Sequence, residues 1–177
     1  MKNEFLQTAA PLLENPTVQA LSIYNHHRDK TRLEHVQEVA WTSFLIAKRF
    51  SKRIVMDRRA IIRGALLHDL FFYDWLREGP RLHGLRHHNI ALKNARKIIS
   101  LSKIEEDIIK KHMWPLTVIP PIYPESFLVA MVDTYCSAKD YIVCRKPEKY
   151  SILFKKYMDS VRSEMRFFVQ DQGLRKK

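Results

Sequence analysis

The chain has 177 residues, 46% of them apolar, which fits one globular domain with a core of useful size. Only four glycines are present, which argues against an architecture with many tight hairpins, and no glycine-rich loop for phosphates or dinucleotides occurs. The formal net charge of +12, from 31 basic and 19 acidic residues, fits an anionic partner and a lysine-rich solvated surface equally well.

Apolar residues that recur every three or four positions predict helices joined by short loops. In the first half of the chain we expect helices over 6–13, 17–24, 32–50 and 58–70. Thr31 and Glu34 have the spacing of a capping box before the third of these helices, and Asp57 is suited to cap the fourth. The aromatic segment 71–81 that follows is expected to be irregular.

The second half of the chain continues the helical pattern. Here we expect helices over 87–100, 102–114, 126–144 and about 147–170. The first of them begins at His87 or Asn89, and three prolines make 116–124 an ordered loop. The fold class expected from the whole pattern is all-α, a single helical bundle.

An adjacent His-Asp pair follows the apolar run of the fourth predicted helix. His68 and Asp69 stand at the C-terminal end of that helix. The helix dipole disfavours an anion at this end, so Asp69 is a poor choice for a purely structural residue. A bound cation would remove the penalty.

Three further polar residues, His35, His112 and Asp133, fall on helix sides that the periodicity assigns to the core. His112 comes four residues after Ile108, and Asp133 comes four residues after Val129. A buried carboxylate costs several kcal/mol unless it is paired or coordinates a metal. Each residue alone would more often be a core or cap residue. Together they favour divalent metal ions held by neutral imidazoles and carboxylates from facing helices.

This pattern resembles the HD superfamily of metal-dependent phosphohydrolases. The matching text is a His in TRLEHVQEVA, a His-Asp pair in RGALLHDL and an Asp in MVDTYCSAKDYI. The intervals fit as well, with 33 residues from His35 to His68 and 64 from Asp69 to Asp133. The resemblance covers about 25–141. Together with the length and the helical pattern, it predicts a single domain over 1–177 with this HD core, a short N-terminal helical extension and a C-terminal helix at about 147–170.

Two more histidines are similar to those of the HD members that bind two metals. His87 in HHNIALKNA and His112 in IIKKHMWPL have their placement. This subgroup includes HD-GYP phosphodiesterases and HD-type diadenosine tetraphosphate hydrolases. The glycine-rich GYP signature is missing, so hydrolysis of cyclic di-GMP is not expected. His83 is the alternative third histidine, while His88 would point about 100° away from His87 around the helix.

The resemblance implies a ligand set and a reaction. One divalent ion would be held by His35, His68, Asp69 and Asp133. A second would be held by His87 and His112, with Asp69 bridging, and His68 and Asp69 would form the catalytic pair. Fe, Mn, Co, Ni and Zn all suit such ligands, and both one and two ions stay open. The expected reaction is hydrolysis of a phosphate ester or phosphoanhydride, nucleotide-like, by a metal-activated water.

Arg32, one turn before His35, and Arg63, on the helix of His68, are weak candidates for binding the phosphates of a substrate. The expected partner is a small phosphorylated molecule such as a nucleotide. One alternative is a non-catalytic metal- or nucleotide-binding sensor, against which the complete ligand set argues. The other is a basic helical nucleic-acid-binding protein, against which the acids interspersed over 147–170 argue. No signal peptide and no bilayer-spanning stretch occur, so we expect no membrane association and a cytoplasmic location.

Overall fold

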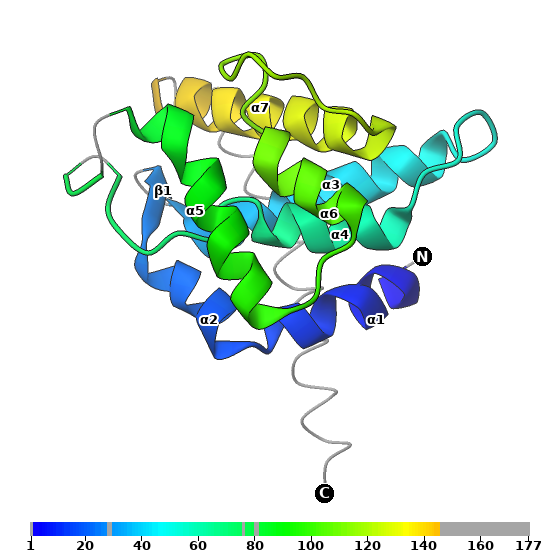
Figure 1. Ribbon diagram of the computed structural model, residues 1–177, viewed down its shortest axis with the longest axis horizontal. Helices are drawn as coiled ribbons and strands as arrows, with labels where there is room; N and C mark the ends of the chain where they lie inside the picture. The colour runs from blue at the N-terminus through cyan, green and yellow to red at the C-terminus, as the bar shows by residue number, and fades with distance from the viewer. Residues whose placement is uncertain (1, 28–29, 76, 80–81, 146–177) are drawn as a thin grey trace, which may run out of the picture. The chain divides into compact units, whose positions relative to one another are not determined.

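The structure, a computed structural model, describes residues 2–27, 30–75, 77–79 and 82–145. These residues form seven α-helices, one 3₁₀-helix and a two-stranded ribbon, which confirms the expected all-α fold (Figure 1). The helices are α1 (Lys2–Leu13), α2 (Pro16–Gln19), α3 (Arg32–Arg49), α4 (Arg58–Leu67), α5 (His83–Ile98), α6 (Lys103–Lys111) and α7 (Pro124–Arg145). The 3₁₀-helix η1 is Ala20–Ile23, and strands β1 (Asn25–His27) and β2 (Lys30–Thr31) pair antiparallel.

The chain divides into two compact units, Met1–Ser137 and Ala138–Lys177. The first unit holds α1 to α6 and most of α7, and the described part of the second is the end of α7. The predicted helix over 147–170 lies outside the described residues, and the single domain over 1–177 stays a prediction. Among the described helices, none is both long and apolar enough to cross a membrane.

Local capping rules account for most helix starts. The Thr31 hydroxyl accepts a hydrogen bond from the Glu34 amide (3.2 Å), and the Glu34 carboxylate accepts one from the Thr31 amide (2.9 Å). This confirms the capping box before α3, and Ser102 with Glu105 forms a second one before α6. Asp57 caps α4 as expected, through the amide of Ala60.

The predicted start of α5 at His87 or Asn89 is wrong, because the helix begins one turn earlier, at His83. Leu82 precedes it in the left-handed region, with φ 62°, and makes no side-chain cap. A non-glycine residue rarely adopts this conformation, so no sequence signal marks the boundary. The predicted helix over 58–70 ends at Leu67, with His68 as its C-cap.

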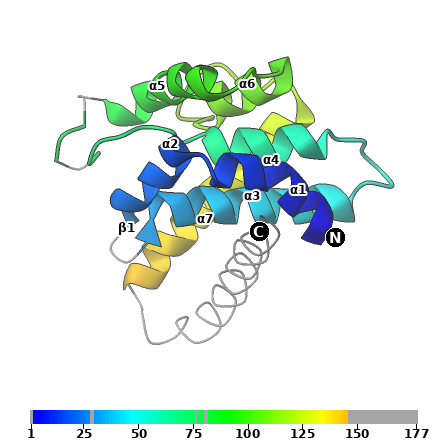
Figure 2. The same cartoon turned by 90° about the horizontal axis from the view of Figure 1, so that it is seen from below.

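The core of the first unit lies around α3 and α4. α3 packs against α4, and α4 also contacts α1 and α6. Figure 2 shows α5 and α6 side by side as a layer next to α4. The fully buried apolar residues come from all of these helices and include Phe5, Val36, Phe44, Ile61, Leu66, Ile108 and Val129.

A glycine sets the spacing between α4 and α6. A Cβ atom added to Gly64 would lie 2.8 Å from the Cδ1 atom and 2.9 Å from the Cγ2 atom of Ile108. Such distances are below van der Waals contact, so only glycine allows this approach of the two helices. His68 and His112 each follow one turn later, at the ends of these helices. Their rings therefore lie close together, with centroids 4.8 Å apart.

Candidate metal centre

The six residues predicted as metal ligands come together at one place in the first unit, and all six are buried. They are His35 on α3, His68 and Asp69 just after α4, His87 on α5, His112 at the C-cap of α6 and Asp133 on α7. Their elements are joined by long-range packing, so the cluster depends on the tertiary fold.

One half of the cluster gathers around Asp133. The Nε2 atom of His35 lies 2.9 Å from Asp133 Oδ1, and the Nε2 atom of His68 lies 3.5 Å from the same oxygen. Ligand atoms of these three residues all lie within 4.8 Å of one another, which is close enough to hold one metal ion.

The other half gathers around Asp69. Its Oδ1 atom lies 3.3 Å from the Nε2 atom of His87 and 3.5 Å from that of His112. Its Oδ2 atom lies 3.9 Å from the Nε2 atom of His68. Asp69 thus stands between the two halves. His68, Asp69 and His112 form a second group whose ligand atoms could hold an ion.

Backbone carbonyls fix the tautomers of three histidines. His68 donates from Nδ1 to Ala65 O (2.7 Å), His112 from Nδ1 to Ile109 O (2.8 Å) and His87 from Nδ1 to His83 O (3.1 Å). In the neutral ring this leaves the Nε2 lone pair free to bind a metal, the usual arrangement for histidine ligands.

The Nε2 atoms of His87 and His112 lie only 2.8 Å apart. Because both Nδ1 atoms donate to carbonyls, two neutral rings would point their lone pairs at each other across this distance. Either a proton or a metal ion must lie between them. Three buried atoms of the cluster also lack any hydrogen-bond partner: His35 Nδ1, His68 Nε2 and Asp69 Oδ1. Unpaired buried polar atoms are rare in proteins, and a bound ion would account for His68 Nε2 and Asp69 Oδ1.

In the metal-free cluster, His68 and the two carboxylates stabilise each other's charged forms. Burial disfavours the charged form of His68, but the carboxylates of Asp69 and Asp133 outweigh it and raise its pKa from 6.5 to about 9. For both carboxylates burial acts against ionisation. The charge on His68 nevertheless leads the effects that hold the pKa of Asp69 and of Asp133 well below 3.8.

The remaining histidines of the centre differ in charge. Burial, together with the charges of His68 and His87, lowers the pKa of His112 to about 3. Burial lowers the pKa of His87, but the combined effects of Asp69 and of the His83 carbonyl outweigh burial and raise it. Without an ion, a proton in the short contact between these two rings is therefore favoured on His87 over His112.

The structure also distinguishes the competing histidines. His87 reaches the cluster, whereas His83 stacks on it with ring centroids 4.5 Å apart and contacts the Tyr73 hydroxyl through Nδ1 (3.1 Å). Burial, then the charge of His87, lowers the pKa of His83 to about 4. His88 is also buried but takes no part in the short contacts between the ligand atoms, and its Nδ1 atom has no hydrogen-bond partner in the described residues.

His26 is a member of the cluster that the sequence reasoning missed. Its ring stacks on that of His35 with centroids 3.7 Å apart, and it offers a ligand atom close to those of His35 and Asp69. His26 lies on β1, in a polar run without helical periodicity. The only available signal was the adjacent pair of histidines at 26–27.

The two arginines considered for substrate binding are engaged elsewhere. Arg32 is fully buried and donates to Phe71 O (2.6 Å) and Tyr73 O (3.2 Å), which fixes the segment after the His-Asp pair. Arg63 pairs with Glu105 (2.9 Å) and donates to Ser100 O (2.9 Å), so the structure does not bring it to the cluster. Their role in binding substrate stays a prediction.

A pocket of about 540 Å³ opens onto the cluster. Asp69, His87, His112 and Asp133 lie on its wall, together with the side chains Phe71, Trp75, His83 and Met113. This volume falls in the range of small-molecule sites. Buried His and Asp groups that could hold a metal ion therefore face a space large enough for a small ligand.

Comparison with protein-family models, with curated proteins and with solved structures found no match for this chain.

Proposed function

We propose that the protein is a metal-dependent phosphohydrolase with an HD-type centre, acting on a phosphate ester or phosphoanhydride. The observation that carries the proposal is the short contact between His87 and His112. Their Nε2 atoms face each other across 2.8 Å beside the shared carboxylate of Asp69. Mixed imidazole and carboxylate ligands suit a divalent transition metal.

We assign the donors to two ions as the resemblance implies. His35, His68 and Asp133 would hold one ion, His87 and His112 would hold a second, and Asp69 would bridge them. A divalent ion there supplies a Lewis acid that polarises a phosphoryl group and lowers the pKa of a water. His68 must give up its proton to become a ligand, so binding of the ion releases a proton at neutral pH.

The residues around the centre fix the orientation of its ligands and line the pocket beside it. Ala65 O, Ile109 O and His83 O hold three imidazole rings in place. Arg32 anchors the carbonyls of the segment that carries Phe71, and this ring forms part of the pocket wall. Such preorganisation keeps ligands in position while a phosphate group binds and water is displaced.

Elemental analysis tests the first step. Purified wild-type protein, reconstituted with Mn²⁺ or Fe²⁺, should hold near-stoichiometric metal, and the Asp69→Asn and His112→Gln variants should lose most of it. Glu78→Gln, which removes an exposed carboxylate outside the cluster, is the matched control and should keep the metal. Circular dichroism of each variant checks that it is folded. Absence of metal in the wild type after reconstitution contradicts the proposal.

Activity tests the second step. The metal-loaded protein should hydrolyse 4-nitrophenyl phosphate, bis(4-nitrophenyl) phosphate or a nucleoside phosphate, and chelation should abolish the reaction. A protein that binds metal stoichiometrically but cleaves no phosphate compound would favour the sensor alternative.

A further inference from the structure

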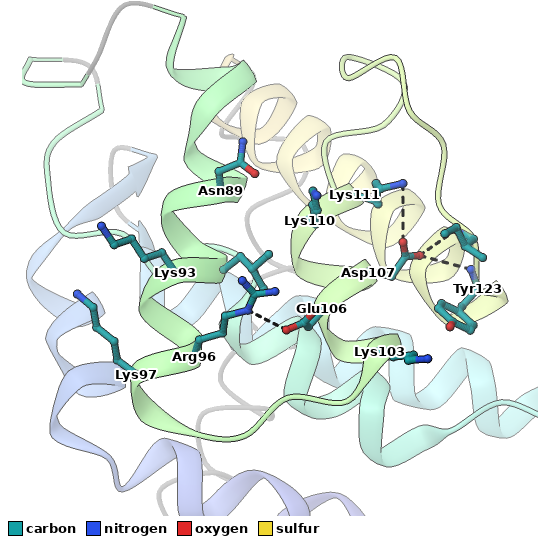
Figure 3. A pocket seen from close by; sticks show the side chains of 12 residues that line it. Asn89, Lys93, Arg96, Lys97, Lys103, Glu106, Asp107, Lys110, Lys111 and Tyr123 are labelled. Carbon is teal, nitrogen blue, oxygen red and sulfur yellow. Dashed lines mark hydrogen bonds and ion pairs between the residues drawn. The ribbon is translucent and has the colours of Figure 1, made fainter.

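A second hollow of the first unit lies on the outer side of α5 and α6. Residues from both helices and from the segment before α7 line this groove, which has a volume of about 740 Å³ (Figure 3). It shares no lining residue with the pocket at the metal centre. Whatever binds in the groove is therefore recognised separately from a ligand of that centre.

The groove is basic. Its cations are Lys93, Arg96, Lys97, Lys103, Lys110 and Lys111. Figure 3 shows Lys93 and Lys97 extending from α5 on the side away from α6, with Lys103 and Lys110 on α6. Cations on both walls give the groove a positive field that concentrates anions.

The two acidic residues of the groove compensate these charges only in part, because both are engaged with particular partners. Glu106 pairs with Arg96 (2.8 Å) across the two helices. Asp107 accepts hydrogen bonds from the amides of Ile122 (2.8 Å) and Tyr123 (3.4 Å), and its other oxygen lies 3.8 Å from Lys111 Nζ.

Four lysines remain: Lys93, Lys97, Lys103 and Lys110. Their side chains are exposed, and none makes an ion pair or a hydrogen bond with another residue in the described part of the chain. Lys93 and Lys97 are also one turn apart on the same helix, an arrangement of like charges that destabilises it. A ligand with several negative charges would relieve this repulsion.

We propose that this groove binds the phosphate backbone of single-stranded nucleic acid. The groove, with a volume of about 740 Å³, has the size of a small-ligand site, so it can hold a few nucleotides of one strand and not a duplex. Lysine side chains are long and flexible and can reach successive phosphates from both walls. Tyr123 lines the groove and is half-buried, so it is the aromatic residue on which a base could stack.

An acidic membrane is the competing partner. The neighbouring loop exposes apolar side chains, with Val118 93% and Ile119 64% exposed. However, the groove is concave. Ile122 on its wall is 73% exposed, but its other aliphatic residue, Leu92, is 6% exposed and out of reach of a flat bilayer. Surface-bound proteins instead present charge and apolar groups on one projecting face. The lysines of the groove therefore fit a strand better than a bilayer.

Binding of fluorescein-labelled oligo(dT), about 15 nucleotides long, measured by fluorescence anisotropy tests the proposal. Four phosphate contacts at a slope of about 0.7 each predict that the affinity falls about 50-fold between about 50 mM and about 200 mM salt. The variant K93Q/K97Q/K103Q/K110Q should bind at least about tenfold more weakly at low salt and lose most of this salt dependence.

The matched control is R49Q/K52Q/R53Q/R59Q. These four exposed cations are likewise without a partner in the described residues, but none of them lines the groove, and the variant removes the same charge. It should keep wild-type affinity. Equal weakening by both variants, or no binding by the wild type, overturns the proposal.

Two further arms identify the partner. Asp69→Asn should bind the strand normally, because Asp69 is not part of the groove. Failure of the metal proposal thus leaves this result unchanged. Binding to phosphatidylserine vesicles that V118S/I119S abolishes, together with no binding to oligo(dT), would assign the surface to a membrane and overturn the proposal.

Discussion

Replacing Gly64 by alanine tests the close approach of α4 and α6. In an ordinary helix the change would stabilise by about 1 kcal/mol, because alanine is the better helix former. Here the new methyl group would meet Ile108 at 2.8–3.0 Å, well inside carbon contact distance. Ile108 is fully buried, and its branched side chain has little rotamer freedom in a helix. The helices must therefore separate.

The expected magnitude follows from two opposing terms. Overpacking a well-filled core costs about 1–3 kcal/mol, and the gain in helix propensity offsets about 1 kcal/mol of this. We expect the free energy of unfolding to fall by about 1 kcal/mol, a shift of about 0.5 M in the urea midpoint. Since His68 and His112 lie one turn beyond the contact, metal affinity at the centre should fall as well.

Urea denaturation of Gly64→Ala and Gly84→Ala provides the measurement and its control. A Cβ atom on Gly84 would meet only the ends of Leu116 (3.1 Å) and Met113 (3.9 Å), so that variant should not lose stability. In a double-mutant cycle, Ile108→Ala makes room for the methyl group, and the combined loss should be at least about 1 kcal/mol below the sum. A Gly64→Ala protein as stable as the wild type, with additive effects, would refute the steric argument.

Three further predictions concern stability. In the metal-free protein the free energy of unfolding should be greatest near pH 6.5. Protonated His68 adds to the free energy of unfolding fully below pH 6.5, and this contribution is lost as pH rises to about 9. His112 is neutral in the folded protein, so the free energy of unfolding also falls as pH drops from 6.5 toward 3. A flat urea-denaturation profile in EDTA from pH 5 to 9 contradicts this prediction. Arg32→Met should lower the free energy of unfolding by about 2–3 kcal/mol, since two carbonyls lose a charged donor, and Arg32→Lys should not fully restore it. Thr31→Ala should cost about 1 kcal/mol through the lost cap of α3, and a thermal melt that does not shift would refute this.

The parts of the fold that sequence predicts are those under local control. Thr31 and Glu34 lie three residues apart, so their capping box is visible in the sequence and α3 begins where expected. The start of α5 is not visible in the same way, because Leu82 takes a left-handed conformation that only the surrounding structure imposes. Helix boundaries therefore fail where tertiary context overrides local signals.

The residues of the candidate centre likewise divide into those that local sequence patterns predict and those that only the tertiary structure brings in. Polar residues on apolar helix faces, such as Asp133, could be recognised because helical periodicity places them inside. His26 could not, since a short strand outside the helical pattern carries it to His35. Burial of Arg32 and the pairing of Arg63 with Glu105 likewise depend on residues from other elements. The basic groove combines two helices, and no single segment of sequence shows it.

The contact between His35 and Asp133 joins residues 98 positions apart. Closing so long a loop opposes folding entropically, and contacts of this range form late compared with local helices. A nascent chain that has emerged only as far as α6 would carry His87, His112 and Asp69 but not Asp133. The half of the centre around Asp69 would be present, but the other half would lack the carboxylate of Asp133. Occupancy of the group formed by His35, His68 and Asp133 would then report completion of folding, and chains truncated before α7 should fail to retain that ion.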